Sequence, residues 1–412
     1  MSGATPAGMH PLTGLRRTDA PSVGVPAATL GELLAGGLPV PGGVALDTRA
    51  HRESMEAAGV AAELSEVYAA ALEIVAGSGR GADLRDACDR MQGLVRKAGL
   101  SDAVRSSLSR AYSALGIGPE DGPATVAVRS SPTVLAGVRW SRTNVRGHEA
   151  VREAIVECWA SALSVEAMVR ASAAGPSAAD LAIGVVVQRM VPAQKAGLAS
   201  TVDPVSGARD RVVVRAAYGQ GEVVITGAVE PDTSVFSVPR LDLLSLRVGH
   251  QTHQIVRGRD GHDLTMTLDP ERAWGRVLDD DLARAVARLA LRAQDRLGGP
   301  QEVEWAVVGR QISVLDARPV HTAAASGARV LLGYDASPSA RSAIEVGARL
   351  LPGSEVTVAH LWTPPFASRP LRRRLLERAN TATELAGVWE REGAAEADRV
   401  ASAGAVLAGA AG

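Results

Sequence analysis

The sequence predicts a protein of the α/β class, with α/β or α+β lobes, whose strands and helices form two lobes around a cleft. The strand signals are a Val-rich run at 126–129 and an apolar run at 184–191, which ends before Pro192. Between them, residues 149–172 carry apolar side chains at helical spacing and predict one long helix. Because 412 residues are too many for one ordinary hydrophobic core, more than one domain is expected.

The other predicted elements are mainly helical. Residues 1–20 contain Pro, Gly and Thr without apolar periodicity and are expected to form a disordered lead. A short helix is expected over 29–35, ending at a Gly-Gly pair, and a Pro- and Gly-rich loop then leads into a strand. Residues 52–114 carry apolar positions at helical spacing and predict several helices. A further helix is expected to run from Asp279 toward Gly298.

The segments 302–306 and 313–319 carry the most informative charges. Each alternates polar with apolar residues around Gly309-Arg310, so together they predict a β-hairpin with acids and an arginine on one face. Mg2+ prefers oxygen ligands and arginine neutralises phosphate, so the pattern is compatible with a Mg–nucleotide site. On spacing alone, a solvated charged face is the commoner explanation.

Charge and cysteine usage exclude several classes of partner. The formal net charge is -1, which gives no general attraction to nucleic acid or to an anionic membrane. Cys88 and Cys158 show neither metal-ligand spacing nor a disulfide framework, as expected in a reduced interior. No stretch of the sequence is close to the length of about 20 consecutive apolar residues that a helix needs to cross a bilayer. We therefore expect a cytoplasmic protein with no nucleic-acid and no membrane partner.

The hairpin reads EVEWA at 302–306 and SVLDARPV at 313–320, which resembles the closing motif of a nucleotide-binding domain. That domain is shared by phosphoenolpyruvate synthase, pyruvate phosphate dikinase and rifampin phosphotransferase, and its usual form is close to DIEWA…ILQARP. Other segments resemble the family in the same order, among them AGLASTVDPVSG at 196–207 and YGQGE at 218–222. The resemblance covers 21–320 and implies a two-lobed ATP-grasp fold.

The resemblance implies phosphate-binding residues in an early strand and the loop after it. VAVRSS at 126–131 matches a family segment whose arginine contacts nucleotide phosphates, so Arg129 is the expected ligand. A surface arginine at a strand end is the alternative. LAG at 135–137 resembles the loop that covers the phosphates, where Gly137 lets the backbone come close to them. Ser141 falls where the family often has a hydroxyl.

The resemblance also implies a site for the adenosine part of the nucleotide. QRMV at 188–191 is similar to the segment between the lobes whose backbone pairs with adenine and whose side chains approach the ribose. Gln188, Arg189 and Val191 are therefore expected to bind the nucleotide. A buried strand without a ligand has the same pattern, so both explanations stay open.

For the chemistry, the resemblance implies Glu304 and Asp316 as Mg2+ ligands and Arg318 as the partner of the γ-phosphate. Family members transfer a phosphoryl group from ATP to a histidine through positioning and charge neutralisation. ATP and Mg2+ are thus the expected cofactors, with Arg129 and Arg318 as the expected catalytic residues.

Departures from the family pattern argue against full activity. The family's GGKxxSLGE appears as GVPAATLGE at 24–32, so Pro26 stands at the phosphate-binding lysine and supplies neither charge nor N–H. The acidic stretch between VRSS and FAG is missing, and Asp316 replaces the glutamine of QARP. The TSHAA signature of the phosphohistidine domain does not occur in the sequence, so a separate protein is expected to carry that domain.

The C-terminal part differs in character. Residues 321–327 are small and polar and predict a linker. Residues 328–412 resemble the β-α-β start of a universal stress protein domain, in which an acid after the first strand, here Asp335, approaches a nucleotide. The Gly-rich phosphate loop of such domains is missing, so a partial doubly wound α/β domain is expected.

Two functions are compatible with these observations. The first is an ATP-dependent phosphotransferase component that binds Mg–ATP and passes phosphate to a histidine domain on another chain. The alternative is a non-catalytic nucleotide-binding sensor or scaffold in a stress response. Pro26 and the shortened loop favour the second function, whereas Arg129, Glu304 and Arg318 favour at least nucleotide binding.

Overall fold

The computed structural model describes most of the chain and divides it into two compact units. The described residues are 8–77, 81–116, 122–133, 140–174, 183–204, 206–258, 263–320, 329–334, 355–360 and 399–407, with scattered positions between 336 and 347. One unit comprises Met1–Val202 with Arg209–Val320, and the other comprises Asp203–Ala208 with His321–Gly412.

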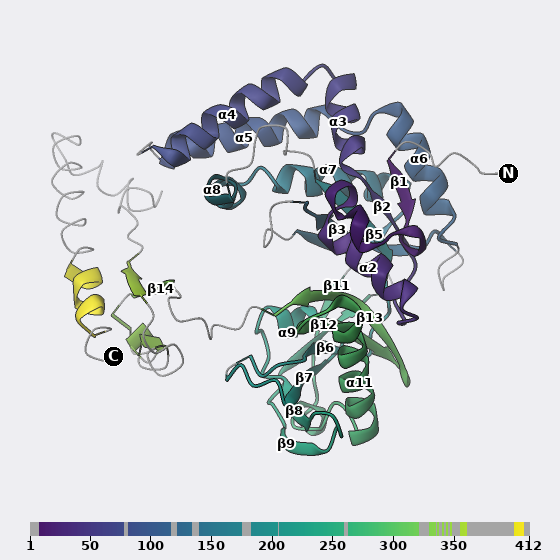
Figure 1. Cartoon of the computed structure of the whole chain (residues 1–412), viewed down its shortest axis with the longest axis vertical. Helices are drawn as coiled ribbons and strands as arrows, with labels where there is room; N and C mark the ends of the chain where they lie inside the picture. Colours follow the sequence, from purple (N-terminus) through teal and green to yellow (C-terminus); the bar gives the residue numbers. More distant parts are fainter. Residues whose placement is uncertain are drawn as a thin grey trace. The chain divides into compact units, whose positions relative to one another are not determined.

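The first unit contains an antiparallel sheet with the strand order β1-β2-β5-β3-β4 in its described part. Its strands are β1 (Met9–Pro11), β2 (Gly43–Leu46), β3 (Thr125–Ser131), β4 (Ser141–Arg146) and β5 (Gly184–Arg189). Helices lie along one face of this sheet (Figure 1). They are α3 (Thr48–Ala57), α4 (Ala61–Ala76), α5 (Gly81–Ala98), α6 (Asp102–Ser113), α7 (His148–Ser161) and α8 (Val165–Ala174). This sheet and its helices form the N-terminal lobe.

A second antiparallel sheet follows in the same unit, with the strand order β13-β12-β6-β7-β8-β9. Its strands are β6 (Lys195–Ser200), β7 (Arg211–Tyr218), β8 (Asp232–Ser237), β9 (Leu243–Arg247), β12 (Gln301–Val308) and β13 (Gln311–Pro319). The long helix α11 (Asp280–Leu297) packs against this sheet, as Figure 1 shows. The sheet and α11 form the second lobe, so the predicted α/β class with two lobes is confirmed.

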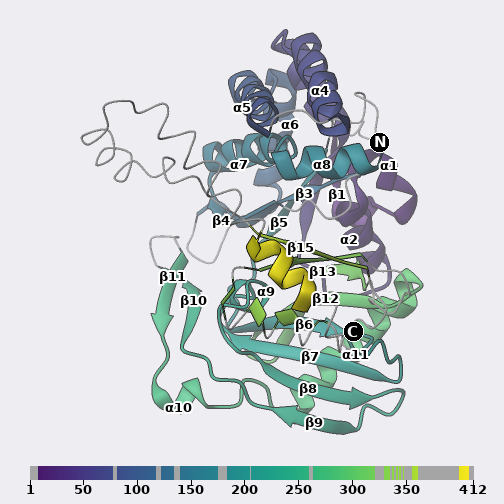
Figure 2. The same ribbon diagram turned by 90° about the vertical axis from the view of Figure 1, so that its left-hand side faces the viewer.

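Short elements complete the unit. They are η1 (Leu12–Gly14), η2 (Arg17–Asp19), α1 (Ala20–Val23), α2 (Val25–Ala35), α9 (Glu222–Ile225), α10 (Pro270–Ala273) and the paired strands β10 (His253–Arg257) and β11 (Asp263–Thr267). Figure 2 shows β10 and β11 side by side as a separate ribbon.

Both faces of the N-terminal sheet are buried, because alternate residues of β5 join different cores. Val185 and Val187 pack into a core formed with the helices α3 to α8. Val186, between them, joins a core that also contains residues of α2, α11 and the second sheet. This second core therefore continues from one lobe to the other, and it fixes α2 where the lobes meet.

Two predicted helices are confirmed, and both end where the sequence indicated. The helix expected after Asp279 is α11, whose first turn is capped by the Asp279 carboxylate accepting from the Leu282 N–H at 2.7 Å. It ends at Gly298, which has a φ of 76° and supplies the left-handed turn. Helix α2 begins at Val25, earlier than predicted, and ends before the expected Gly-Gly pair.

Two other expectations are wrong. Residues 8–20 of the expected disordered lead are ordered, because β1 pairs with β2 and Leu12 is completely buried. The long helix expected over 149–172 is broken after Ser161, and α8 starts after Ser164, whose hydroxyl accepts from the Ala167 N–H at 3.2 Å. A serine cap thus starts a new helix where apolar periodicity alone suggests continuity.

The described part of the second unit contains the strands β14 (Arg329–Gly333) and β15 (Glu355–Ala359). They pair in parallel, with Leu331 opposite Thr357, as expected for a β-α-β start of a doubly wound domain. The linker at 321–327 and Asp335 lie outside the described residues, as does most of the helix expected between the strands.

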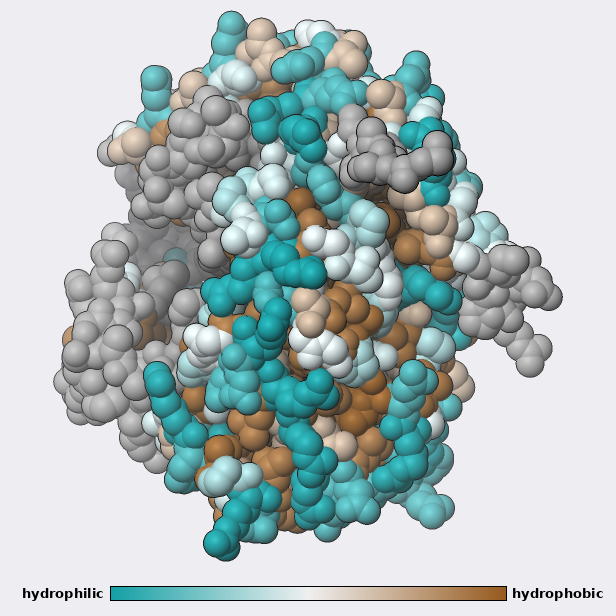
Figure 3. All heavy atoms as spheres, turned by 45° about the vertical axis from the view of Figure 1, so that its right-hand side comes forward, coloured by the Kyte–Doolittle hydropathy of each residue, from teal (hydrophilic) through white to brown (hydrophobic). Residues whose placement is uncertain are grey.

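The surface mixes apolar with polar side chains. Among the described residues, no helix has the length and apolar character needed to span a membrane. On the face in Figure 3, hydrophobic residues reach the surface among hydrophilic ones. Large exposed apolar side chains include Leu244 and Trp274, and such scattered exposure is ordinary for a folded protein.

Candidate nucleotide-binding site

A cavity of about 630 Å3 lies where the two lobes of the first unit meet. Its walls come from β3, β4 and the end of β5 in the N-terminal lobe, and from β6, β12 and β13 in the second lobe. Pro26 and Leu30 of α2 also line it. The cavity is therefore bounded by elements that are distant in sequence.

The structure brings the described members of the predicted site together around this cavity. They are Arg129, Ser141, Gln188, Arg189, Val191, Glu304, Asp316 and Arg318. Gly137 lies outside the described residues. Their spatial convergence is a finding, whereas the role of each in binding stays a prediction.

The hairpin of β12 and β13 arranges its charged side chains by strand register. Glu302 lies opposite Arg318, and Glu304 lies opposite Asp316. Gly309, with a φ of 60°, opens the tight turn between the strands. Because side chains alternate along a strand, Glu302 and Glu304 lie on the same face, as the sequence predicted. The register shifts immediately after Glu304, between that residue and Trp305.

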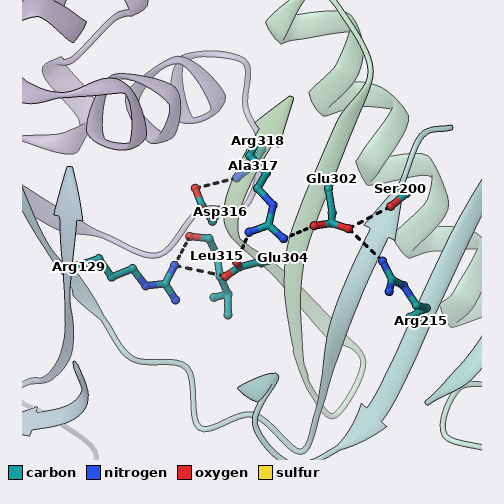
Figure 4. A network of polar contacts seen from close by, with 9 residues as sticks. All are labelled: Arg129, Ser200, Arg215, Glu302, Glu304, Leu315, Asp316, Ala317 and Arg318. Atoms are coloured by element: carbon teal, nitrogen blue, oxygen red, sulfur yellow. Dashed lines mark hydrogen bonds and ion pairs between the residues drawn. The ribbon is translucent and has the colours of Figure 1, made fainter. Parts of the chain in front are cut away.

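Glu304 is the centre of an ion-pair network that links the two lobes (Figure 4). Its Oε2 lies 3.6 Å from Nη1 of Arg129, which comes from β3. Its Oε1 lies 3.9 Å from Nη1 of Arg318 on the neighbouring strand. Arg129 also donates to the carbonyl oxygen of Leu315 at 3.3 Å. The two guanidinium groups predicted to bind phosphate therefore converge on one carboxylate.

The sequence interpretation did not assign a site role to Glu302 or Arg215, which extend the network. Glu302 bonds to the Arg318 guanidinium, accepts from Nη2 of Arg215 at 3.0 Å and accepts from Oγ of Ser200 at 3.4 Å. The signal for Glu302 was available, because it lies two residues before Glu304 on the same strand face. Arg215 lies on β7, and nothing in its local sequence indicates this pairing.

The network is balanced in charge, and its carboxylates are largely shielded from water, whereas the Arg318 side chain is 39% exposed. The side chains of Glu302 and Glu304 are 15% and 13% exposed, and Arg129 is 18% exposed. Asp316 is 3% exposed and accepts from the N–H of Ala317 at 2.9 Å. Buried carboxylates need such partners, because an unpaired buried charge is strongly destabilising. The network thus keeps several ionic groups inside a cavity without leaving a large uncompensated charge.

The wall formed by α2 has a different character. Gly24 precedes the helix with a φ of 85°, and a Cβ there would lie 1.9 Å from the Ser131 carbonyl oxygen, so only glycine fits. Pro26 lies in the first turn of the helix and lines the cavity. Its ring contributes no charge and no N–H. The position that resembles the family's lysine therefore faces the cavity with an apolar side chain.

The protein itself satisfies the free N–H groups at the start of α2. The Val25 N–H donates to the Pro132 carbonyl oxygen at 3.1 Å. The Ala27 N–H donates to Oγ of Ser131, also at 3.1 Å. Helix N-termini attract anions through N–H groups that lack a partner. Here those groups are already used in packing α2 against β3.

The end of β5 and the residues that follow it connect the lobes along the cavity. Gln188 is 2% exposed, and its Nε2 lies at 3.5 Å from the Pro41 carbonyl oxygen. Arg189 is exposed, and the N–H of Met190 donates to the Thr125 carbonyl oxygen at 2.9 Å. These bonds hold the segment firmly, but they suit a plain structural strand as well as a nucleotide-binding one.

Glu304 and Asp316 are suitable ligands for a magnesium ion that is shared with phosphate. They lie opposite each other on paired strands and offer carboxylate oxygens inside the cavity. Across the described ranges, no three His, Cys, Asp or Glu side chains gather as a metal cage. Mg2+ commonly uses one or two carboxylates together with substrate phosphates and water, so the pair fits that mode.

Comparison with known proteins agrees with this geometry. The family model for the pyruvate phosphate dikinase AMP/ATP-binding domain matches residues 20–331. A probable phosphoenolpyruvate synthase from Archaeoglobus fulgidus is 32% identical over 319 residues, which are 76% of this chain and 41% of the relative. A second, from Methanothermobacter thermautotrophicus, is 31% identical over 317 residues, or 75% of this chain and 45% of the relative.

A rifampicin phosphotransferase from a Streptomyces species is 29% identical over 308 residues, which are 73% of this chain and 34% of that protein. The matched segment thus spans less than half the length of each of these relatives. The similarity concerns one domain and does not extend to the rest of those proteins.

Proposed function

The chain belongs to the pyruvate phosphate dikinase AMP/ATP-binding domain family, and on this basis we propose that its cavity binds ATP with Mg2+ and that the bound ATP phosphorylates a histidine on another polypeptide. The two-lobed α/β architecture is of the ATP-grasp type. The observation that supports the proposal best is the convergence of Arg129, Glu304, Asp316 and Arg318 on one cavity between the lobes.

Within this proposal, each wall of the cavity has a task. Arg129 and Arg318 bind phosphate oxygens from opposite lobes, which places the triphosphate across the cleft. The segment 188–191 contacts adenine and ribose, while Gly137 and Ser141 approach the phosphates. A magnesium ion held by Glu304 and Asp316 supplies further charge neutralisation when bound. The chain's own contribution is positioning and charge, as phosphoryl transfer requires.

The proposed acceptor is a histidine of a separate domain. The chain contains no TSHAA sequence, and its matched segment spans only part of each relative. In the same proposal, the nucleotide-binding domain covers 21–320, residues 321–327 link it to the C-terminal part, and 328–412 form a partial domain like that of universal stress proteins. The parallel pairing of β14 with β15 supports the last assignment.

The α2 wall favours a second function, a non-catalytic nucleotide-binding sensor or scaffold. Pro26 removes a cation from the cavity, and Ser131 and Pro132 use the N–H groups at the start of the helix. Loss of one charge-assisted contact in a transition state lowers a rate by about 100- to 1,000-fold. Binding with very slow turnover is therefore the expected behaviour of the isolated chain.

Incubation with radiolabelled ATP and Mg2+ tests both functions. We expect retention of labelled nucleotide by the protein and only slow release of phosphate, with labelling of an added phosphohistidine-domain protein if the first function holds. Retention without transfer to any such domain would favour the sensor. Rapid phosphate release by the isolated chain would contradict the inferred loss of catalytic power.

A further inference from the structure

The Glu304 carboxylate lies between two guanidinium groups from different lobes. Oε2 lies 3.6 Å from Nη1 of Arg129, and Oε1 lies 3.9 Å from Nη1 of Arg318 (Figure 4). Each carboxylate oxygen thus has its own arginine. A phosphate group bridging the same two arginines would use the same arrangement of oxygens.

The two contacts are ion pairs of a kind that can exchange. Both distances exceed the range of about 2.7 to 3.2 Å for a good N–H···O hydrogen bond. Arg129 also has the Leu315 carbonyl oxygen as an acceptor, and Arg318 also bonds to Glu302. Loss of Glu304 as a partner therefore does not leave either guanidinium isolated. The arginines can change partners at modest cost.

Repulsion between the Glu304 carboxylate and phosphate means that the arginines must change partners before metal-free ATP binds. The Glu304 side chain is only 13% exposed, so its charge is weakly screened by water. A phosphate that approaches Arg129 and Arg318 meets this carboxylate at the same place, and the two negative groups repel each other. A divalent cation removes the conflict, because Glu304 and the opposite Asp316 are both oxygen ligands for it.

Building on the proposed function, we propose that Glu304 occupies the phosphate position of the nucleotide-free cavity and that a divalent cation frees Arg129 and Arg318 by binding this carboxylate. The ligand that the cavity prefers is then the magnesium complex of a nucleoside triphosphate, and the metal-free nucleotide binds more weakly. Glu304 acts both as a metal ligand and as an internal competitor of phosphate.

This dual role leads to opposite effects of one substitution. Glu304→Gln removes the competing charge, so metal-free ATP should bind about three- to tenfold more tightly than to the unmodified protein. The same variant loses a magnesium ligand, so Mg2+ should enhance its ATP affinity less. A residue that only bound the metal would produce the second effect without the first.

Calorimetric titration of ATP, in EDTA and in excess MgCl2, separates these cases on the full chain. Glu304→Ala serves as a second variant, with the same expected gain in EDTA. Glu222→Gln is the charge-matched control, because Glu222 lines the same cavity from α9 but lies outside the ion-pair network. The ATP affinity of this control in EDTA should rise by less than about twofold.

The outcomes distinguish the inference from the function on which it rests. Tighter metal-free binding by both Glu304 variants, but not by Glu222→Gln, is the predicted result. Suppose that the unmodified protein binds Mg–ATP, but that the Glu304 variants show no gain in ATP affinity in EDTA or that Glu222→Gln gains equally. The competitor role of Glu304 is then wrong, and the proposed function stands. If the unmodified protein binds no nucleotide under either condition, both fail.

Discussion

The two walls of the cavity differ in how they use their polar groups. On the hairpin wall, Glu304 and Arg318 project charge into the cavity and pair loosely enough to exchange. On the α2 wall, Pro26 presents no charge, and the N–H of Ala27 is committed to Ser131. The hairpin wall retains charged groups that are able to bind a ligand, whereas the polar groups of the α2 wall are used in hydrogen bonds that stabilise the fold.

This difference separates binding from catalysis in physical terms. In the proposed function, the hairpin wall and Arg129 hold the Mg–triphosphate without a cation from α2, because each charge-assisted hydrogen bond contributes about 1.5 to 3 kcal/mol. Acceleration of phosphoryl transfer needs charge around the reacting phosphate, and a cation from α2 would supply part of it. Substitutions on each wall should therefore have distinct signatures.

The largest effect is expected on the hairpin wall. Arg318→Ala should weaken Mg–ATP binding by about 30- to 100-fold, because it removes a guanidinium that is proposed to bond phosphate. Calorimetry measures the affinity. Arg310→Ala is a matched control at the turn of the same hairpin, where Arg310 pairs with Asp279 at 2.8 Å. Equal affinities of Arg318→Ala and the unmodified protein would show that the hairpin wall does not bind the nucleotide.

On the α2 wall, Ser131→Ala should act on stability. Ser131 is completely buried, accepts from the Ala27 N–H and donates to the Val23 carbonyl oxygen at 2.7 Å. Its loss leaves both backbone groups unsatisfied and should lower the free energy of unfolding by about 2 kcal/mol. Urea denaturation measures this change, with Ser22→Ala as an exposed serine control. A change in the unfolding free energy no larger than that of the control would contradict the structural use of this wall.

The smallest effect is expected from restoring a cation to the α2 wall. Pro26→Lys should raise Mg–ATP affinity about tenfold, because the first turn of α2 lines the cavity and lysine neutralises phosphate. Phosphate release from ATP should rise as well. Pro26→Ala removes the ring without adding charge and should not show this gain. Identical behaviour of the Lys and Ala variants would place the phosphates away from α2.

The hairpin and its charges could be predicted from sequence because the information is local. Alternation fixes which face carries Glu304, and Gly309 marks the turn, so register and face follow together. The resemblance to a family then supplied the partners on distant strands. Without it, no local signal relates Arg129 of β3 to Glu304 of β12.

The wrong predictions for residues 8–20 and for the helix over 149–172, and the missed pairing of Arg215, have non-local or competing causes. β1 is short and is stabilised by pairing with β2 and by the contact of His10 with Asp47 at 3.0 Å, neither of which its composition indicates. The break before α8 depends on Ser164 acting as a cap, a signal weaker than the apolar periodicity around it. Arg215 reaches Glu302 because the sheet places β7 and β12 on either side of the single strand β6, and local sequence does not indicate that strand order.

The most direct measurement is a crystal structure with Mg2+ and a non-hydrolysable ATP analogue. We expect the triphosphate in the cavity between the lobes, with phosphate oxygens on Arg129 and Arg318 and the metal on Glu304 and Asp316. Glu304 should then have moved off both guanidinium groups. An analogue bound elsewhere would contradict the proposed nucleotide site, and one bound here with the Glu304 ion pairs intact would contradict the competitor role of Glu304.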